Sequence, residues 1–314
     1  MSSPSVTALA GGIGAARFLR GLVQVVDPAN LTVIVNVGDD IELHGLHVCP
    51  DLDSITYWLA GVVHPEQQWG RADETFVVAE ELERFGEPRW FALGDRDLAT
   101  HLFRTRRLRD GVALSEVTAE ITRAFGLAST LLPATDDPVA TRVVTTDGRD
   151  LHFQEWWVGE RAASDVAEVR LKGGETASPA PGVIEALEAA DVVVICPSNP
   201  VVSIGTILAV PGIHEALESS HAPVVGVSPI VGGSVVRGMA DRLLPSIGVE
   251  VSAVGVAEHY RPFLDAWIID QADAGLRKQI AAFGLDVTVM DTMLDTTEQA
   301  AAVAAACMAA GGWA

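Results

Sequence analysis

The fold class is decided by the stretch DVVVIC at residues 191–196, which runs directly into PSNP at residues 197–200. A short, uninterrupted run of β-branched apolar residues is typical of a parallel strand that helices cover on both faces. The polar residues that follow such a strand lie at the carboxyl edge of the sheet, where open α/β folds bind their ligands. Ser198 and Asn199 are therefore candidate ligand-binding residues.

Similar runs recur before and after this strand, separated by segments of helical periodicity. Strands that alternate with helices indicate a doubly wound, mostly parallel Rossmann-like sheet in a three-layer αβα arrangement. A β-hairpin is expected at residues 142–158, and the last helix is expected at residues 296–310. The further strands are predicted at residues 5–10, 31–35, 223–227, 249–255, 267–270 and 286–290.

The segment of residues 65–132 departs from this alternation. Amphipathic helical stretches such as residues 76–85 and 114–125 dominate it, and no convincing strand is evident. We therefore expect a nucleotide-binding α/β core formed by residues 1–64 and 133–314. Residues 65–132 are expected to form a helical subdomain inserted into that core.

The composition limits the classes of partner. With 314 residues and an apolar share of 49%, the chain can bury a large core. Its formal net charge of -21 argues against nucleic acid or an anionic membrane as a partner, because both need a basic face on the protein. A small phosphorylated ligand remains compatible with this charge, since a bound cation reverses the local sign.

The cysteines and the chain start indicate a cytoplasmic protein. The three cysteines are far apart in sequence and have no paired spacing, which suggests neither a zinc site nor a disulfide framework. A reducing cytosol is the simple inference. No basic segment followed by an apolar one opens the chain, and no uncharged run reaches the roughly 18 residues of a membrane span.

A glycine-rich turn, GGIG at residues 11–14, follows the first predicted strand and precedes a helical pattern. Glycines at Gly11, Gly12 and Gly14 let backbone N–H groups approach a phosphate at a helix amino terminus. A tight turn whose glycines serve only packing explains the same residues equally well. The turn lacks both the dinucleotide-binding spacing and the Lys-Ser/Thr end of a P-loop. Arg17, one helical turn further, either turns toward an anion or lies in solvent.

The densest set of polar side chains is NVGDDIELHGLHVCPDLD at residues 36–53, directly after the second predicted strand. Carboxylates, imidazoles and an amide are the usual ligands of a divalent cation and of the phosphates that accompany it. A solvated loop whose acids cap the next helix is the alternative. The candidate site residues in this stretch are Asn36, Asp40, His44, Asp51 and Asp53.

An excess of arginine marks the predicted insertion. LGDRDLATH at residues 93–101 is followed closely by Arg104, Arg106, Arg107 and Arg109. In so acidic a chain these cations are candidates to face a phosphorylated ligand. For any single arginine, pairing with neighbouring acids is the better-supported alternative.

Taken together, these motifs resemble the CofD family. They occur in the order expected of that family and span almost the whole chain, from residue 11 to the last helix. The motifs are GGIG (11–14), CPDLD (49–53), LGDRD (93–97), DDP (136–138), PSNPVVSIG (197–205), SPIVG (228–232) and GVAE (255–258).

The resemblance implies a transferase of coenzyme F-420 biosynthesis. Family members move a 2-phospholactyl group, and actinobacterial relatives a phosphoenolpyruvyl group, from a guanosine diphosphate-activated donor. The acceptor is the terminal ribityl hydroxyl of the deazaflavin Fo, and GMP is released. A homodimer is expected as the commonest assembly.

The resemblance also implies roles for single residues. Asp51 and Asp53 would hold Mg²⁺, or Mn²⁺, with Asp53 also orienting the hydroxyl, and Asp51, Asp53 and Arg96 would be the catalytic residues. Asp95 and Arg96 would close the cleft from the insertion, and the deazaflavin ring would lie between Trp58, residues 93–101 and the loop before Pro138. Nucleotide and phosphates would be bound by Gly11, Gly12, Gly14, Asn36, Asp40, His44, Asp95, Ser198, Asn199, Ser228, Gly232 and Gly233.

One alternative belongs to another class of protein. YvcK-like nucleotide-sugar-binding regulators share the glycine turn but are not transferases. The segments at residues 94–97 and 136–138 favour the transferase. A nicotinamide dehydrogenase is disfavoured, because no full dinucleotide fingerprint follows the first strand.

Overall fold

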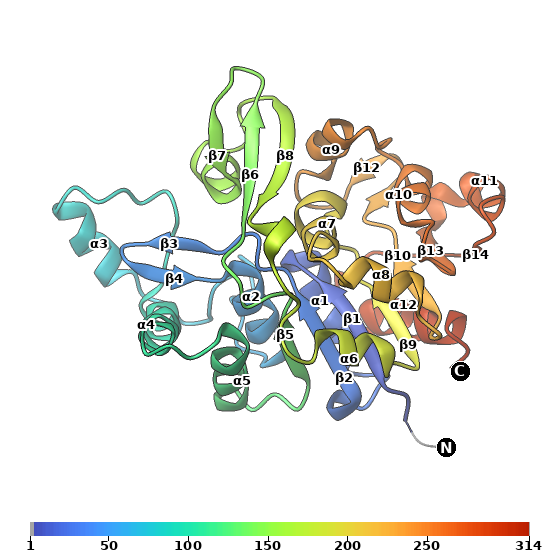
Figure 1. Ribbon diagram of the computed structural model, residues 1–314, viewed down its shortest axis with the longest axis horizontal. Helices are drawn as coiled ribbons and strands as arrows, with labels where there is room; N and C mark the ends of the chain where they lie inside the picture. Colours follow the sequence, from blue (N-terminus) through green and yellow to red (C-terminus); the bar gives the residue numbers. More distant parts are fainter. Residues whose placement is uncertain (1–2, 314) are drawn as a thin grey trace.

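The computed structural model describes residues 3–313 and is built on a seven-stranded parallel sheet (Figure 1). The strand order is β14-β13-β10-β9-β1-β2-β5, so the strand within DVVVIC lies at the centre, as predicted. Leu9 pairs with Ile34 on one side and with Ile195 on the other. The strands are β1 (Val6–Ala10), β2 (Leu31–Val35), β5 (Thr130–Pro133), β9 (Val192–Ile195), β10 (Val224–Val227), β13 (Ala266–Asp270) and β14 (Asp286–Met290).

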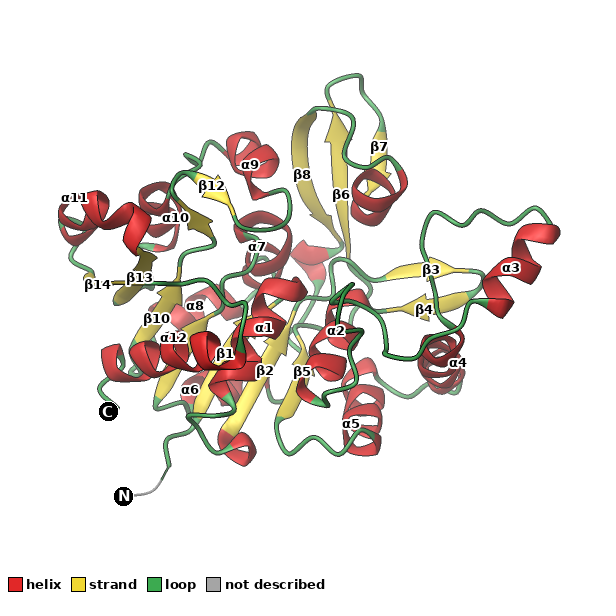
Figure 2. Cartoon of the chain, turned by 180° about the vertical axis from the view of Figure 1, so that it is seen from behind, coloured by secondary structure: helices red, strands yellow, loops and turns green. Residues whose placement is uncertain are grey.

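Helices cover both faces of this sheet, which confirms the three-layer prediction (Figure 2). Alternate residues of one strand enter opposite cores: Ala8 packs toward the α1 side, and Leu9 packs toward the α8 side. On the first face lie α1 (Gly12–Leu22), α2 (Pro50–Leu59) and α12 (Thr297–Ala310). On the second face lie α6 (Val183–Glu188), α7 (Gly205–Leu208), α8 (Ile213–Glu218), α10 (Ala253–Tyr260) and α11 (Arg277–Ala281).

The first and last long helices, α1 and α12, touch backbone to backbone. A Cβ atom on Gly21 would lie 2.2 Å from the carbonyl carbon of Ala300, so only glycine permits this approach. α12 begins with a capping box, in which Thr296 Oγ1 accepts from the Gln299 N–H at 3.2 Å and the Gln299 side chain accepts from the Thr296 N–H at 3.0 Å. The predicted C-terminal helix is confirmed.

The predicted insertion is largely helical, with α3 (Val77–Arg84), α4 (Asp95–Arg109) and α5 (Leu114–Ala124). Two features depart from the prediction. β5 starts at Thr130 and joins the main sheet, so the expected boundary at residue 133 falls within this short edge strand. The polar stretch after β2 forms a hairpin of β3 (Ile41–Leu43) and β4 (Leu46–Val48), which lies beside α4 (Figure 1).

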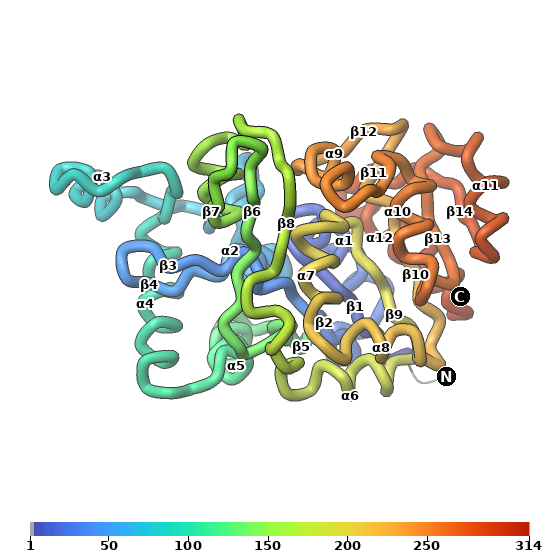
Figure 3. Tube along the Cα trace, turned by 45° about the horizontal axis from the view of Figure 1, so that its top comes forward, coloured from blue at the N-terminus to red at the C-terminus, as the bar shows by residue number. Residues whose placement is uncertain are grey.

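A separate antiparallel sheet in the order β7-β6-β8 stands between the insertion and the C-terminal half (Figure 3). Its strands are β6 (Ala140–Thr145), β7 (Asp150–His152) and β8 (Val166–Lys172). The predicted hairpin strand through residue 158 is wrong, because residues 155–159 form a helical turn. Trp156 in that turn is fully buried, and its indole N–H donates to the Ser164 carbonyl at 3.0 Å. Tertiary burial of the aromatic side chain therefore overrides its strand propensity.

The predicted strand at residues 249–255 is also wrong. Ser252 is instead the N-cap of α10, and its Oγ accepts from the Gly255 N–H at 2.9 Å. No helix within residues 3–313 is long and apolar enough to cross a membrane. The remaining elements are β11 (Ile230–Val231), β12 (Ser234–Val235), α9 (Ala240–Leu243) and helical turns at Pro28–Asn30, Gly174–Thr176, Pro200–Ile204, Leu244–Ile247 and Gln271–Leu276.

Candidate functional site

A cleft of about 490 Å³ opens at the carboxyl edge of the sheet. It lies where the strand order reverses between β1 and β9, the place at which doubly wound sheets bind ligands. Loops after β1, β9 and β10 form its floor, and α2 and α4 contribute one wall. Eight of the predicted site residues line it: Gly11, Gly12, Gly14, Asp51, Asp53, Ser198, Asn199 and Ser228.

The glycine turn combines both of the roles considered for it. The Gly11 N–H donates to Ser198 Oγ at 3.1 Å, and a Cβ on Gly11 would lie 2.7 Å from Asp51 Oδ2. A Cβ on Gly14 would lie 2.6 Å from the Pro197 carbonyl oxygen, so these two glycines serve packing. Gly12 differs: its φ is +72°, and a Cβ there would meet no atom of the described chain within 4 Å. It lines the cleft at the amino end of α1, where Gly11 provides no side-chain cap, and helix amino ends of this kind bind anions.

Asn36 positions Asp51 but does not line the cleft itself. Its Nδ2 donates to Asp51 Oδ2 at 2.9 Å and to the Val202 carbonyl at 3.1 Å. Its Oδ1 accepts from the Gly38 N–H at 2.8 Å and from Thr206 Oγ1 at 2.5 Å. The predicted ligand-binding role of Asn36 is therefore replaced by an orienting role, with the side chain completely buried.

Asp39, which the sequence interpretation did not select, lines the cleft together with Asp51. Each residue is only 5% exposed. Burial raises the pKa of Asp51 to about 6, although hydrogen bonds from Asn36 and Gly12 oppose this shift. Burial and the charge of Asp51 raise the pKa of Asp39 well above its usual range. Asp39 Oδ1 has no hydrogen-bond partner within the described chain, so an uncompensated oxygen is available to a cation.

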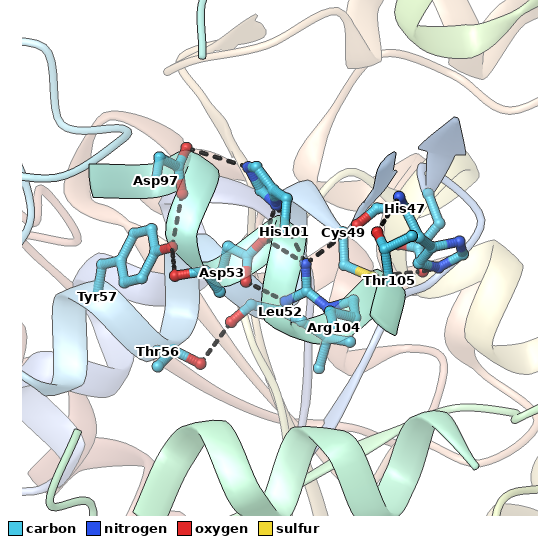
Figure 4. A network of polar contacts seen from close by, with 12 residues as sticks. His47, Cys49, Leu52, Asp53, Thr56, Tyr57, Asp97, His101, Arg104 and Thr105 are labelled. Atoms are coloured by element: carbon cyan, nitrogen blue, oxygen red, sulfur yellow. Dashed lines mark hydrogen bonds and ion pairs between the residues drawn. The ribbon is translucent and has the colours of Figure 1, made fainter. Parts of the chain in front are cut away.

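Asp53, two residues further along α2, faces different partners (Figure 4). Arg104 of α4 binds both of its carboxylate oxygens, through Nη1 at 3.0 Å and through a second, shorter contact from Nη2. Burial alone would lower the pKa of Arg104, but the Asp53 carboxylate outweighs it and raises that pKa. Residues i and i+2 of a helix do not face each other, which separates Asp53 from Asp51. The predicted pair of cation ligands is thus divided between two environments.

Three more side chains complete the buried network around Asp53 (Figure 4). His101 Nδ1 lies 3.6 Å from Asp53 Oδ2, and its Nε2 lies 3.4 Å from Asp97 Oδ2. The Tyr57 hydroxyl donates to Asp97 Oδ1 at 2.6 Å. Burial would raise the pKa of Asp97, but contacts with His101 and Tyr57 lower it. Although ligand atoms of Asp53, Asp97 and His101 lie within 4.8 Å of one another, Arg104 already compensates Asp53, so the network fits a joint between α2 and α4.

Several predicted residues of the insertion and hairpin do not line the cleft. Asp95 accepts from Thr75 Oγ1 at 2.6 Å and from two N–H groups at the start of α3, which is a structural role. Arg96 is exposed, and His44 pairs with Glu87 at 3.4 Å. Asp40 belongs to a separate cluster with His47 and Cys49.

Two further predictions fail for geometric reasons. Gly232 and Gly233 form the exposed turn between β11 and β12 and do not line the cleft. Trp58 is buried outside the cleft, where its indole N–H donates to the Gln68 carbonyl at 3.1 Å. Trp58 therefore does not line the cleft, whereas its neighbour Tyr57 does, together with Asp97 and His101 of the predicted segment 93–101.

Two arginines, Arg17 and Arg237, line the cleft. Arg17 of α1 is mostly buried, and its Nε has no partner within residues 3–313. Arg237 follows β12, and its Nη1 donates to Gln68 Oε1 at 2.6 Å. Burial and the nearby charge of Arg17 lower the pKa of Arg237. An anion between these two cations would relieve their repulsion.

Part of the cleft lining is aromatic. Phe153 and Trp157 stack with ring centroids 6.2 Å apart and an interplanar angle of 24°. Both precede β8, in the region that the sequence interpretation assigned to a strand, so no pattern identified them as cleft residues. Tyr57, Trp69 and Phe91 also line the cleft.

A family model and similar curated proteins agree on one family for this chain. The family model described as 2-phospho-L-lactate transferase CofD matches residues 6–308. A Streptomyces griseus protein named phosphoenolpyruvate transferase is 52% identical over 304 residues, covering 95% of this chain and 96% of that protein. Proteins of the same name from Streptomyces coelicolor and Thermobifida fusca are 53% and 49% identical, covering 94% and 96% of this chain and 95% and 96% of theirs.

Solved structures show the same fold at lower identity. Two crystal structures of a Bacillus halodurans protein of the UPF0052 family match with TM-scores of 0.63 and 0.65 at 19% and 20% identity. They cover 98% of this chain and 99% and 100% of theirs. The Rossmann-like fold is thus confirmed, and the relatives near 50% identity do not favour the regulator alternative.

Proposed function

We propose, because the chain belongs to the CofD family of transferases in coenzyme F-420 biosynthesis, that it moves a phosphoenolpyruvyl group to the deazaflavin Fo. The donor would be the guanosine diphosphate-activated form of enolpyruvate, and GMP would leave. The enolpyruvyl donor is preferred over the lactyl donor because the relatives near 50% identity are named phosphoenolpyruvate transferases.

The observation that carries this proposal is the lining of the cleft, which combines charged groups with aromatic rings. At the sheet edge lie the amino end of α1, the carboxylates of Asp39 and Asp51, and the guanidinium groups of Arg17 and Arg237. The stacked rings of Phe153 and Trp157 line the same cleft. A nucleotide diphosphate suits the charged groups and a flat deazaflavin ring suits the aromatic ones, so one cleft offers contacts to both donor and acceptor.

The transfer would be a substitution at phosphorus. The terminal ribityl oxygen forms a bond to the distal phosphorus of the donor, the bond from that phosphorus to the GMP oxygen breaks, and the hydroxyl proton is lost to solvent. This chemistry asks the protein for positioning and for charge stabilisation on the phosphoryl oxygens. Arg17, Arg237 and the first-turn N–H groups of α1 are the groups of this chain placed to supply both.

A divalent cation fits the buried carboxylate pair better than the pair expected from sequence. Asp39 and Asp51 would hold Mg²⁺, or Mn²⁺, because their oxygens are hard ligands and Asp39 Oδ1 lacks a partner within the described residues. When bound, the cation would neutralise charge on the phosphates. Asn36 keeps Asp51 oriented toward this position.

The test is to incubate the protein with Fo, Mg²⁺ and each activated donor, and to follow the product and GMP by mass spectrometry. Formation of the enolpyruvyl product with stoichiometric GMP supports the proposal. Trp157→Ala should raise the Michaelis constant for Fo with little change in donor affinity, whereas Trp58→Ala, outside the cleft, serves as the matched control. Nucleotide binding without turnover would instead return the regulator alternative.

The proposed assembly is a homodimer, since closed two-fold symmetry is the commonest arrangement of soluble enzymes. Light scattering after size-exclusion chromatography measures the mass directly. A mass near one chain, 33.1 kDa, would exclude the dimer at the concentration used.

A further inference from the structure

A second group of polar side chains lies outside the cleft, where the β3–β4 hairpin meets the start of α2. Asp40 follows β2, His47 lies in β4, and Cys49 directly precedes α2. Cys49 Sγ donates to Asp40 Oδ2 at 2.9 Å, and His47 Nε2 lies 3.2 Å from the same oxygen. One oxygen, one imidazole nitrogen and one sulfur thus lie within 4.8 Å of one another, and Figure 4 shows His47 and Cys49 at the edge of the polar network.

We propose that Asp40, His47 and Cys49 form a zinc site. A thiolate, an imidazole and a carboxylate are a ligand set that zinc binds with tetrahedral geometry. Zinc–ligand bonds of about 2.0–2.3 Å place tetrahedral ligand atoms about 3.3–3.7 Å apart. The observed separations of 2.9 and 3.2 Å therefore need only a small widening. Three protein ligands leave the fourth position for water.

An unpartnered buried oxygen points independently to a missing ligand. Asp40 Oδ1 has no hydrogen-bond partner in the part of the chain that the structure describes, and the Asp40 side chain is only 7% exposed. A buried polar atom without a partner costs free energy that a bound cation would recover. The His47 side chain is 37% exposed, so an ion can reach the cluster from solvent on that side.

Zinc binding would release the proton of the Cys49 thiol. Cys49 loses the proton that it now donates to Asp40, this proton passes to solvent, and the zinc–sulfur bond forms. The chemistry differs from that of the cleft, where Asp39 and Asp51 offer only oxygen and suit Mg²⁺. The proposal therefore does not depend on the proposed transferase reaction.

Bound zinc would tie the hairpin to the helix that carries Asp51 and Asp53. The three ligands belong to three consecutive segments, the loop after β2, β4 and the N-cap of α2. We therefore expect zinc to raise the thermal unfolding temperature of the whole chain, because the ion binds the folded state only. The spacing of the cysteines predicted no zinc site, because only the fold brings this one cysteine beside a histidine and an aspartate.

The experiment uses the full chain, stripped of metal with a chelator and titrated separately with Zn²⁺ and Co²⁺. We expect one ion per chain, a thiolate-to-cobalt charge-transfer band, and a higher Tm with zinc. His47→Ala and Cys49→Ser should each weaken zinc binding by roughly tenfold or more. His44→Ala, on the same hairpin, and Cys307→Ala, a buried thiol of α12, are matched controls that should bind as wild type.

The proposal is wrong if the chain binds no stoichiometric zinc, or if bound cobalt shows no thiolate band. It is also wrong if His44→Ala loses as much affinity as His47→Ala. His47 is partly exposed, so His47→Ala keeps the test decisive even if Cys49→Ser misfolds. Transferase turnover with Mg²⁺, measured on the same samples, reports separately on the proposed function.

Discussion

Asp51 and Asp53 stand two residues apart in the first turn of α2, yet they belong to different regions of the molecule. Asp51 lies at the floor of the cleft, against the glycine turn and Asn36, and its hydrogen bonds within the described residues come from neutral groups, the Asn36 amide and the Gly12 N–H. Asp53 lies in the wall, where Arg104 binds both of its oxygens. A buried carboxylate without a cationic partner is thus available to a ligand, whereas a carboxylate paired with an arginine on another helix holds the two helices together.

The largest expected effect is on stability, at the ion pair between Asp53 of α2 and Arg104 of α4 in the cleft wall. Arg104→Met should lower the free energy of unfolding by about 3–5 kcal/mol, because it leaves the buried Asp53 carboxylate unpaired. Urea denaturation measures this loss. Asp53→Leu combined with Arg104→Met should recover much of it, since both charges are then gone.

Arg107→Met is the matched control on the same helix. Its ion pair with Glu120 is partly exposed, so solvent screens it and the stability should change far less. Equal losses for the two arginine variants would mean that burial of the Arg104 pair is not what holds α2 to α4.

The second expected effect is on turnover and on its Mg²⁺ requirement, through Asp51 at the cleft floor. Asp51→Asn should reduce kcat on the order of 10²–10³-fold and raise the Mg²⁺ concentration needed for half-maximal rate, while the fold persists. Asp53→Asn should leave the Mg²⁺ requirement of the folded fraction unchanged but lower its stability. A Mg²⁺ requirement that shifts only in Asp53→Asn would reverse the assignment of the two carboxylates.

A smaller effect is expected at the glycine turn. Gly12→Ala places a methyl group on the open side of a residue with φ of +72°, and should weaken binding of a guanosine nucleotide by roughly tenfold, or 1.4 kcal/mol. Gly61→Ala, with φ of +69° and equally open surroundings outside the cleft, carries the same backbone strain. Calorimetry should find nucleotide affinity preserved in Gly61→Ala; a matching loss there would assign the effect to strain alone.

The smallest expected effect is on the pH dependence of stability, through His152 of the antiparallel sheet. Burial lowers the pKa of His152, whose Nδ1 accepts from the Gln154 N–H at 3.1 Å and whose Nε2 lies 3.0 Å from the Asp40 carbonyl. Because the unfolded chain binds this proton more readily, stability should fall as the pH drops through the ordinary histidine value of about 6.5. The loss should level off below the lowered folded pKa.

His152→Gln should flatten this part of the stability curve, which denaturation at a series of pH values can follow. NMR titration of the imidazole gives the pKa itself. A folded pKa at or above the ordinary value would contradict the expected sign.

The parallel sheet could be predicted from sequence because each of its strands is indicated by its own residues. The apolar runs of β1, β2, β9, β10 and β13 each carry their own evidence of burial, and the loops after β1 and β9 follow from them. β3 and β4 have only three residues each, and β8 alternates between partly buried and exposed positions, so neither offers a comparable signal.

The site could be predicted only in part, because its chemistry depends on the direction in which each side chain points. Composition identified the 36–53 stretch, but it could not distinguish Asp39, which faces the cleft, from Asp40, which faces Cys49. Nor could it show that Arg104, more than fifty positions away, compensates Asp53 and not Asp51. Such pairings are set by the packing of α4 on the hairpin and α2, which no short pattern in the sequence records.

The backbone contact between α1 and α12 has a consequence for synthesis of the chain. The helix behind the glycine turn is covered at Gly21 by Ala300, which is synthesised much later in the same chain. During translation, β1 likewise cannot pair with β9 until the long segment between the two strands has been synthesised. The end of the cleft at the glycine turn can therefore close only once α12 has been synthesised, and truncation within α12 should leave chains that depend on chaperones and bind nucleotide poorly.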